Sequence, residues 1–292
     1  MTIKKPITNF LSAENSACAG CGQITASRAV VNTLGPDTIV VNATGCLEVT
    51  TSQYPSSAWK LPWIHSLFAN PAPLASGILA ALRQQKKKAK ILIQAGDGST
   101  FDIGFGAVSG MWDRGDDIIY VCYDNEVYAN TGMQASAATP YGSRTTTTPY
   151  GKLLDGHKKN MIDIALSHGL KYVAQTTAGF IDDLKEKVIK ASKTNGPSYI
   201  QVLSPCVPGW SVAIADSVKV AQLASLSGLY PGLEYVNGEL TKVIKITRPQ
   251  IKVWEYLQYQ SRFRHLAKTK EGQAILAELQ ALADSNIKKY RL

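Results

Sequence analysis

The sequence predicts an α/β fold in which a mostly parallel sheet is flanked by helices. The first observation is a pair of apolar runs, residues 91–95 and 118–123, separated by a helix-like segment that begins at about Thr100. A strand, a crossover helix and a second strand in this order form a parallel pair. The second observation is that further β-branched runs and helical patterns follow one another along the 292 residues, of which 45% are hydrophobic and 18% charged. This composition is ordinary for a globular protein, and the length could hold one large domain or two small ones.

The remaining elements are predicted in chain order from periodicity and from turn-forming residues. We expect helices at 23–34, 73–85, 160–172 and 181–194, and further strands at 38–42 and 198–203. Residues 133–151 carry Ser, Thr and two prolines and predict a long ordered loop, which in a compact domain often serves function. Beyond about residue 240 the pattern becomes charged and helical, in a stretch too short for a core of its own. The chain therefore divides into a domain at 1–240 and a helical C-terminal extension at 241–292.

The charge pattern argues against nucleic acid and membrane as partners. The formal net charge is +9, but Lys86, Lys87 and Lys88 follow a predicted helix and are interpreted as its solvated end, and the rest of the basic excess is spread out, with much of it after Lys242. We expect this basic surface to meet an acidic protein. The apolar stretches are interrupted by charge or Gly, and the first residues lack the apolar run of a signal peptide. The expected location is the cytoplasm.

Polar residues follow the two apolar runs at the point where each predicted strand ends. Gly96, Asp97 and Gly98 come after the first run, and Asn125 comes after the second. Because parallel strands place their carboxyl ends side by side, Asp97 and Asn125 should face one crevice. A carboxylate and an amide oxygen suit Mg2+, which completes its shell with water and phosphate oxygens. The glycines would let backbone approach a diphosphate, and the next helix would offer free N–H groups, whereas the alternative reading is a simple tight turn.

Four of the five cysteines lie at turns or strand ends. Cys18 and Cys21 form a CxxC motif, while Cys46 and Cys206 each follow a predicted strand. Cys122 lies inside the run 118–123 and reads as a buried thiol. The other four could form disulfides, a zinc site or an iron–sulfur cluster, and the expected cytoplasmic location argues against disulfides. The spacing alone leaves zinc and iron–sulfur open, since either takes four cysteines.

Taken together, the motifs resemble a known family. CAGCG, NATGC, GDG with YDNEVYANTG, and SPC occur in this order between about Cys18 and Trp210. This arrangement is similar to the β subunit of 2-oxoacid:ferredoxin oxidoreductases, the pyruvate type in particular. The resemblance implies a thiamine diphosphate-binding fold of the diphosphate-module type. It also implies a [4Fe-4S] cluster and Mg2+; the cluster ligands would be Cys18, Cys21, Cys46 and Cys206, and the Mg2+ ligands Asp97, Asn125 and the carbonyl of Val127.

The resemblance assigns further residues to the site. The residues implied to contact thiamine diphosphate are Thr44, Gly45, Cys46, Leu47, His65, Gly96, Asp97, Gly98, Ser99, Asn125 and Val127. Asn130 and Thr131 match the element that faces the substrate, with turn formation around Gly132 as the alternative. An ordinary satisfied histidine is the alternative for His65. Several relatives carry His-x-Leu-His-Gly-Arg where this chain has Phe68 at the second histidine, a departure that favours pyruvate over 2-oxoglutarate.

The implied reaction is the oxidative decarboxylation of pyruvate with coenzyme A to acetyl-CoA and CO2, with electrons passed through the cluster to ferredoxin. The pyrimidine-binding module of such enzymes has no counterpart in this sequence. We therefore expect the chain to be inactive alone and to need partner subunits of the alpha, gamma and delta types. The alternatives are the same chemistry on 2-oxoisovalerate, 2-oxoglutarate or oxalate, or a thiamine enzyme subunit without redox chemistry that carries a structural zinc site.

Overall fold

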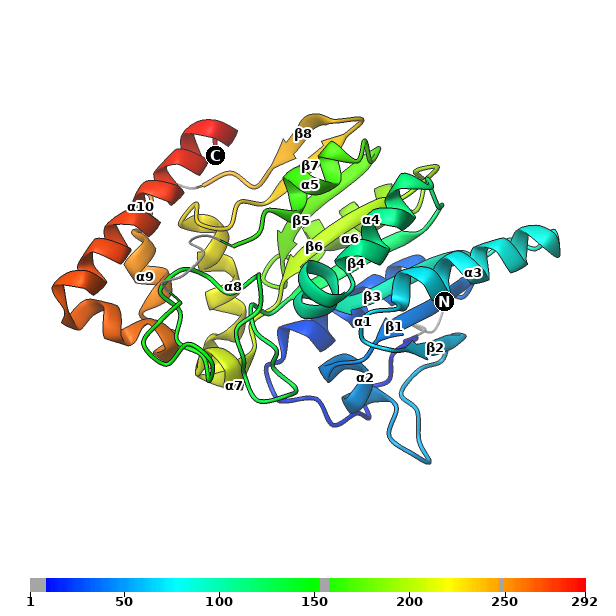
Figure 1. Ribbon diagram of the computed structural model, residues 1–292, viewed down its shortest axis with the longest axis horizontal. Helices are drawn as coiled ribbons and strands as arrows, with labels where there is room; N and C mark the ends of the chain where they lie inside the picture. Colours follow the sequence, from blue (N-terminus) through cyan, green and yellow to red (C-terminus); the bar gives the residue numbers. More distant parts are fainter. Residues whose placement is uncertain (1–8, 153–157, 247–248) are drawn as a thin grey trace, which may run out of the picture.

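The computed structural model describes residues 9–152, 158–246 and 249–292, which fold around an eight-stranded sheet (Figure 1). The strand order across the sheet is β2-β1-β3-β4-β6-β5-β7-β8. The first six strands in the chain are parallel, whereas β7 and β8 pair antiparallel at one edge. The strands are β1 (Thr38–Ala43), β2 (Trp63–Ser66), β3 (Lys90–Gly96), β4 (Ile119–Asp124), β5 (Tyr172–Thr177), β6 (Ser198–Leu203), β7 (Leu233–Val236) and β8 (Glu239–Val243). The predicted mostly parallel α/β fold is confirmed.

Helices cover both faces of the sheet. On one face, α1 (Gly22–Leu34) and α6 (Ile181–Ala191) share a core with residues from β1, β3, β4, β5 and β6. On the other face lie α3 (Pro71–Gln84), α4 (Phe105–Asp113) and α5 (Met161–Ser167). Strands β4, β5 and β6 are buried along their whole length, because both faces are covered. Such strands read as continuous apolar runs rather than as alternating patterns.

The C-terminal extension packs on the body through a third apolar core. This core joins α8 (Ser217–Leu226), α9 (Val253–Leu257), the 3-10 helix η3 (Ser261–Lys268) and α10 (Lys270–Tyr290) to Leu203 and Trp210, which belong to the end of β6 and to α7 (Val207–Trp210). Figure 1 shows α10 running along the outside of α9 and α8, away from α3. The extension, which is too short for a core of its own, therefore shares this core with the body. Strand β8 crosses residue 240, so the domain division expected there remains a prediction.

One local prediction was wrong, and one predicted helix is present but begins with a different geometry. The helix expected at 160–172 ends at Ser167, and Tyr172 instead begins strand β5. Strand β5 ends in the polar residues Gln-Thr-Thr. The sequence did not indicate a strand here, because a polar run is atypical of a fully buried strand. The helix expected from about Thr100 begins as a π-helix, η1 (Gly98–Ile103), before α4 continues it. Single π turns are rare and often lie at functional sites.

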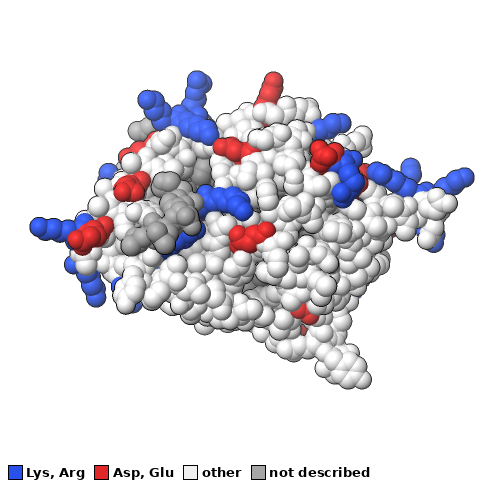
Figure 2. All heavy atoms as spheres, in the orientation of Figure 1, with Lys and Arg blue, Asp and Glu red and all other residues white. Residues whose placement is uncertain are grey.

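The surface agrees with the charge pattern of the sequence. Figure 2 shows Lys and Arg gathered at the free end of α3 and over the C-terminal region, while the lower part of this face carries few charges. Lys86, Lys87 and Lys88 are exposed just after α3. Within the described ranges, no helix combines the length and the apolar character needed to cross a membrane.

Candidate functional site

Four neighbouring strands end at one edge of the sheet and deliver the predicted site residues there. Strands β1, β3, β4 and β6 lie side by side and run parallel. Cys46 follows β1 after a short turn, Asp97 follows β3, Asn125 follows β4, and Cys206 follows β6. The register fixes this, because the last residues of β3 and β4 pair with each other, as do those of β4 and β6. Carboxyl ends of parallel strands are where open α/β sheets bind ligands.

Asp97 and Asn125 meet as the sequence predicts. The backbone N–H of Asn125 donates to Asp97 Oδ1 over 3.4 Å, and the Ser136 hydroxyl donates to Asp97 Oδ2 over 2.5 Å. Asp97 is 1% exposed. Burial, followed by the charge of Asp124, raises the pKa of Asp97 to about 8, although the Ser136 hydrogen bond opposes this rise. The charge of Lys158 also opposes the rise, but among the residues that the structure describes no cation forms an ion pair with Asp97, so this carboxyl group could take a metal ion as its partner.

The backbone turns sharply after Asn125. Glu126 adopts a φ of 65°, which is uncommon for a residue other than glycine, and the Val127 N–H donates to Asn125 Oδ1 over 3.2 Å. Val127 is 2% exposed, yet its carbonyl accepts no hydrogen bond from the residues that the structure describes. A buried carboxylate, an amide oxygen and a free carbonyl form a donor set that fits Mg2+.

The two glycines of the GDG motif differ in their surroundings. A Cβ at Gly96 would meet nothing within 4 Å, so open space lies in front of this residue. A Cβ at Gly98 would lie 2.1 Å from Cε1 of Tyr128 and 3.0 Å from Cζ of Phe68. Tyr128 is held there by donating to Asp102 of η1 over 2.6 Å. Tyr128 therefore ties the loop after Asn125 to η1, whose N-terminus follows Gly96 and Asp97 in the chain.

The four predicted cysteines surround one cavity. A cavity of about 230 Å³ is lined by Cys18, Cys21, Cys46 and Cys206, and also by Asn125 and Asn130. Three of the four are at helix N-termini: Cys21 caps α1, Cys46 begins α2 (Cys46–Thr51), and Cys206 caps α7 with its Sγ accepting from the Gly209 N–H over 3.3 Å. Such positions favour negative charge on sulfur.

Neighbouring thiols also raise one another's pKa. Burial raises the pKa of Cys46 to about 11, and the neighbouring Cys21 and Cys18 add to the rise. Burial likewise raises the pKa of Cys206 to about 12, with a contribution from Cys46. All the cysteines are free thiols. Four of them line one cavity, and in the described part of the chain no three Cys, His, Asp or Glu side chains form a group that could hold one metal ion. Cys122 is fully buried in the core, as predicted.

The structure brings together most of the other predicted site residues. Asn130 is exposed and lines the cysteine cavity, while the Thr131 hydroxyl donates to Oε1 of Gln134 over 2.6 Å and shapes the turn. Thr44 Oγ1 lies 2.7 Å from His65 Nε2. The remaining residues also occupy this edge: Leu47 is buried beside the cavity, Gly45 caps α2, and Ser99 donates to the carbonyl of Phe68 over 2.6 Å.

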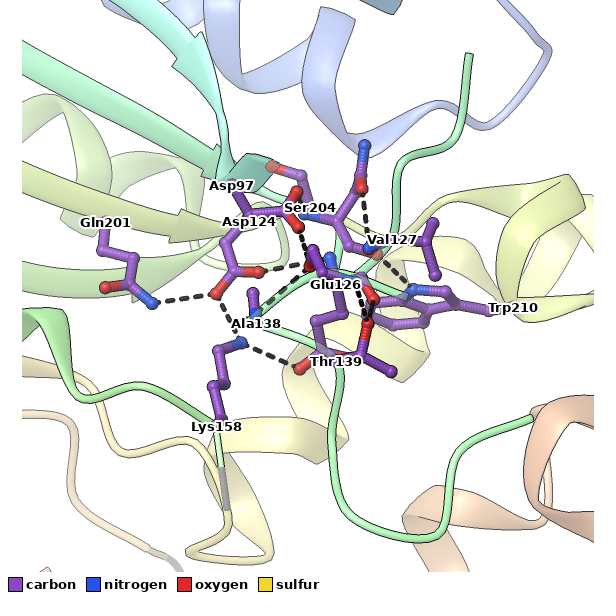
Figure 3. Close-up of polar contacts among 12 residues, drawn as sticks. Asp97, Asp124, Glu126, Val127, Ala138, Thr139, Lys158, Gln201, Ser204 and Trp210 are labelled. Carbon is purple, nitrogen blue, oxygen red and sulfur yellow. Dashed lines mark hydrogen bonds and ion pairs between the residues drawn. The ribbon is translucent and has the colours of Figure 1, made fainter. Parts of the chain in front are cut away.

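Sequence reasoning missed a buried charged group directly behind the predicted metal ligands (Figure 3). Lys158 forms ion pairs with Asp124 and with Glu126, the latter at 3.0 Å, and Gln201 donates to Asp124 over 2.8 Å. Despite burial, the charges of Lys158 and Arg262 hold the pKa of Glu126 below its usual value. The acidic residues on both sides of Asn125 could have indicated this charged group, because buried carboxylates require cations. Their cationic partners, Lys158 and Arg262, are far away in the sequence.

Comparison with known proteins agrees with this geometry. The family described as thiamine pyrophosphate enzyme, C-terminal TPP binding domain, matches residues 43–202. Pyruvate synthase subunit PorB of Methanosarcina barkeri is 46% identical over 288 residues, which cover 97% of this chain and 97% of the relative. Ketoisovalerate oxidoreductase subunit VorB of Pyrococcus horikoshii is 39% identical, and the match covers 91% of this chain and 90% of the relative.

A solved structure shares the fold over nearly the whole chain. The structure of 2-oxoglutarate:ferredoxin oxidoreductase from Magnetococcus marinus has a TM-score of 0.61 at 21% sequence identity. The match covers 95% of this chain and 97% of that chain. Because the match leaves so little of either chain uncovered, it includes most of the C-terminal extension.

Proposed function

Because this chain belongs to the family of pyruvate synthase subunits PorB, we propose that it is the thiamine diphosphate-binding subunit of a pyruvate:ferredoxin oxidoreductase. This enzyme would convert pyruvate and coenzyme A to acetyl-CoA and CO2 and pass the electrons to ferredoxin. One observation carries the proposal: Asn125 contacts Asp97 and also lines the cavity of the four cysteines. The expected metal–diphosphate site and the expected cluster site are thus neighbours at one edge of the sheet.

In this proposal Asp97, Asn125 and the carbonyl of Val127 hold Mg2+, which in turn holds the diphosphate. Asp97 is buried, and among the residues that the structure describes no cation contacts its carboxyl group, so burial favours the protonated form; a divalent ion would displace this proton and compensate the carboxylate charge. The open space at Gly96 and the backbone N–H groups at the start of η1 suit the diphosphate oxygens. These residues bind and orient the cofactor.

We assign Cys18, Cys21, Cys46 and Cys206 to a [4Fe-4S] cluster. When bound, thiamine diphosphate supplies an electron sink for decarboxylation, and the cluster supplies a one-electron acceptor. The proposed oxidation needs a one-electron acceptor, which an iron–sulfur cluster supplies and a zinc ion does not. This favours the cluster over the structural zinc alternative at the cavity that the four cysteines line. Helix N-termini at three of these cysteines would offset the negative charge of the thiolates.

Asn130 is placed to present its amide to the substrate. It is exposed, lines the same cavity as the cysteines, and sits on a turn that Thr131 and Gln134 fix by two hydrogen bonds. The Thr146 hydroxyl donates to the carbonyl of Gly132 over 2.8 Å and supports the turn from the long loop. In the proposal Thr44 and His65 contact the thiamine as a hydrogen-bonded pair.

The proposal includes partner subunits of the alpha, gamma and delta types, one of which supplies the pyrimidine-binding module. Large apolar side chains lie exposed near the site edge, with Tyr54 98% exposed and Leu67 71% exposed. Both belong to the segments around α2 and β2, which border Thr44 and His65. Exposed apolar groups of this kind mark protein interfaces. We place the partner subunit over this surface and the complex in the cytoplasm.

A second candidate is the same chemistry on 2-oxoisovalerate. The observation that favours it is the 39% identity to a ketoisovalerate oxidoreductase subunit, not far below the identity to the pyruvate synthase subunits. A pocket that differs by a branched side chain discriminates by only about 1–3 kcal/mol. Both substrates must therefore be compared directly.

The test is turnover by the complex purified without air from cells that express all its subunits. We expect coenzyme A-dependent reduction of ferredoxin with pyruvate, a lower kcat/KM with 2-oxoisovalerate, and no turnover by this chain alone. Full turnover by the isolated chain would overturn the need for partners. A complex that binds thiamine diphosphate but reduces no acceptor with any 2-oxoacid would overturn the proposed reaction.

A further inference from the structure

Arg262 connects the C-terminal extension to the loop that carries the expected metal ligands. It lies in η3, is 4% exposed, and its Nη2 forms an ion pair with Glu126 Oε2. The two residues are 136 positions apart in the chain. Glu126 is the residue between Asn125 and Val127, so the extension reaches the centre of the metal-binding turn.

The same guanidinium also acts on Asn125 through Trp210. Its carbon lies 4.2 Å from the centre of the Trp210 ring, within range of a cation–π contact. Trp210 is completely buried, and its Nε1–H donates to the carbonyl of Asn125 over 2.7 Å. Figure 3 shows the Trp210 ring reaching the backbone beside Glu126 and Val127. One arginine thus supports both residues that begin the turn.

The turn needs this support because its backbone is strained. Glu126 holds a φ of 65°, a conformation that is uncommon for a residue other than glycine and persists only when its surroundings impose it. Its carboxylate is held by Lys158 and Arg262, and its carbonyl accepts from the Thr139 hydroxyl over 2.7 Å. The conformation at Glu126 decides how Asn125 Oδ1 and the Val127 carbonyl are presented together.

We propose that Arg262 is a positioning residue for the metal–diphosphate site, so that the C-terminal extension completes this site from behind. The inference rests on the proposed function, because it concerns the affinity for Mg2+ and thiamine diphosphate. Arginine is required rather than lysine, since only a planar guanidinium can stack on Trp210 while its edge donates to Glu126. Arg262 Nε and Nη2 also donate to Gln260 Oε1 over 2.9 and 2.7 Å, which fixes the orientation of the plane.

The experiment compares Arg262→Lys and Arg262→Met with Arg264→Met in the full chain, purified with its partner subunits. Arg264 lies two residues further along η3 and is exposed, so it controls for the loss of a positive charge from the same helix. Binding of thiamine diphosphate is measured by equilibrium dialysis at increasing Mg2+, and Mn2+ is used as a paramagnetic probe of the same site. Iron content and the thermal midpoint without ligand are measured on each protein.

We expect both Arg262 variants to need about 10–100-fold more Mg2+ for half-saturation, as is typical when a residue behind a metal ligand is lost, and Arg264→Met to match the unchanged chain. A purely structural role would lower the number of binding sites and the thermal midpoint but leave the Mg2+ dependence of the remaining sites unchanged, and that result overturns the proposal. Should Arg262→Met fail to fold, Arg262→Lys carries the test alone, because it keeps the positive charge and removes only the planar guanidinium that stacks on Trp210 and donates to Glu126. Absence of Mg2+-dependent binding in the unchanged chain would overturn the proposed function itself, and this inference with it.

Discussion

Removing the ammonium of Lys158 should destabilise the fold far more than removing a surface lysine. Lys158 is paired with Asp124, whose side chain is fully buried, and with Glu126, whose side chain is 5% exposed. Taking one partner from a buried ion pair costs about 3–5 kcal/mol, because the remaining charge is left without compensation. Arg262 stays paired with Glu126 in the variant Lys158→Met, so the lower end, about 3 kcal/mol, applies.

The assay is urea unfolding of the full chain, monitored by tryptophan fluorescence. A loss of about 3 kcal/mol corresponds to a fall of roughly 6 °C in the thermal midpoint for a chain of this size. The control is Lys185→Met, because Lys185 pairs on the surface with Asp182, whose side chain is 93% exposed. This variant should lose less than about 0.5 kcal/mol.

A double variant decides whether the charge is the cause. Lys158→Met combined with Asp124→Asn should be more stable than Lys158→Met alone, because the uncompensated carboxylate is gone. Two results would contradict a buried ion pair at Lys158. One is that Lys158→Met loses no more free energy of unfolding than Lys185→Met, and the other is that Asp124→Asn restores none of the stability lost in Lys158→Met.

Two further outcomes follow from the same structure. Gly98→Ala should lower the free energy of unfolding, measured in urea, by about 1–3 kcal/mol, because its Cβ would overlap the ring of Tyr128. Gly96→Ala should keep its stability but bind thiamine diphosphate more weakly in dialysis, and equal stability of the two variants would contradict this prediction. Burial alone would raise the pKa of Asp183, but the Lys187 ammonium 2.5 Å away outweighs it and holds the pKa low. Because the carboxylate is favoured in the folded state, this contribution is present above about pH 4 and is lost as the pH falls further. Asp183→Asn should therefore be less stable than the unchanged chain at pH 7 and nearly equal to it at pH 2, and a constant difference would argue against the ion pair.

The strands that build the site could be predicted because each combines a buried apolar run with a turn of Gly, Asp or Asn at its end. Strand β6 agrees residue by residue with the expectation, and β1, β3 and β4 agree to within one residue at each end. Strand β5 could not be recognised, because its side chains Gln175, Thr176 and Thr177 are polar. Partners outside the strand make them compatible with burial, such as the Pro231 carbonyl for Gln175 and Asp183 for Thr176.

The predicted site residues were accessible from sequence for the same reason: strand ends determine where Cys46, Asp97, Asn125 and Cys206 lie. The residues behind them were not. Arg262 comes from a tail that local patterns describe only as charged and helical, and its role depends on a contact that bridges most of the second half of the chain. Electrostatic partners of buried groups are set by the tertiary fold and leave no local periodicity in the sequence.

The most direct test of the account is metal analysis of the chain purified in the complete absence of air. About four irons and four sulfides per chain, lost in Cys206→Ser and kept in Cys122→Ala, are the predicted result, because Cys206 lines the cavity and Cys122 lies in the core. Stoichiometric zinc without sulfide in such a preparation would contradict the assignment of an oxidoreductase and leave a thiamine-binding fold with a structural metal.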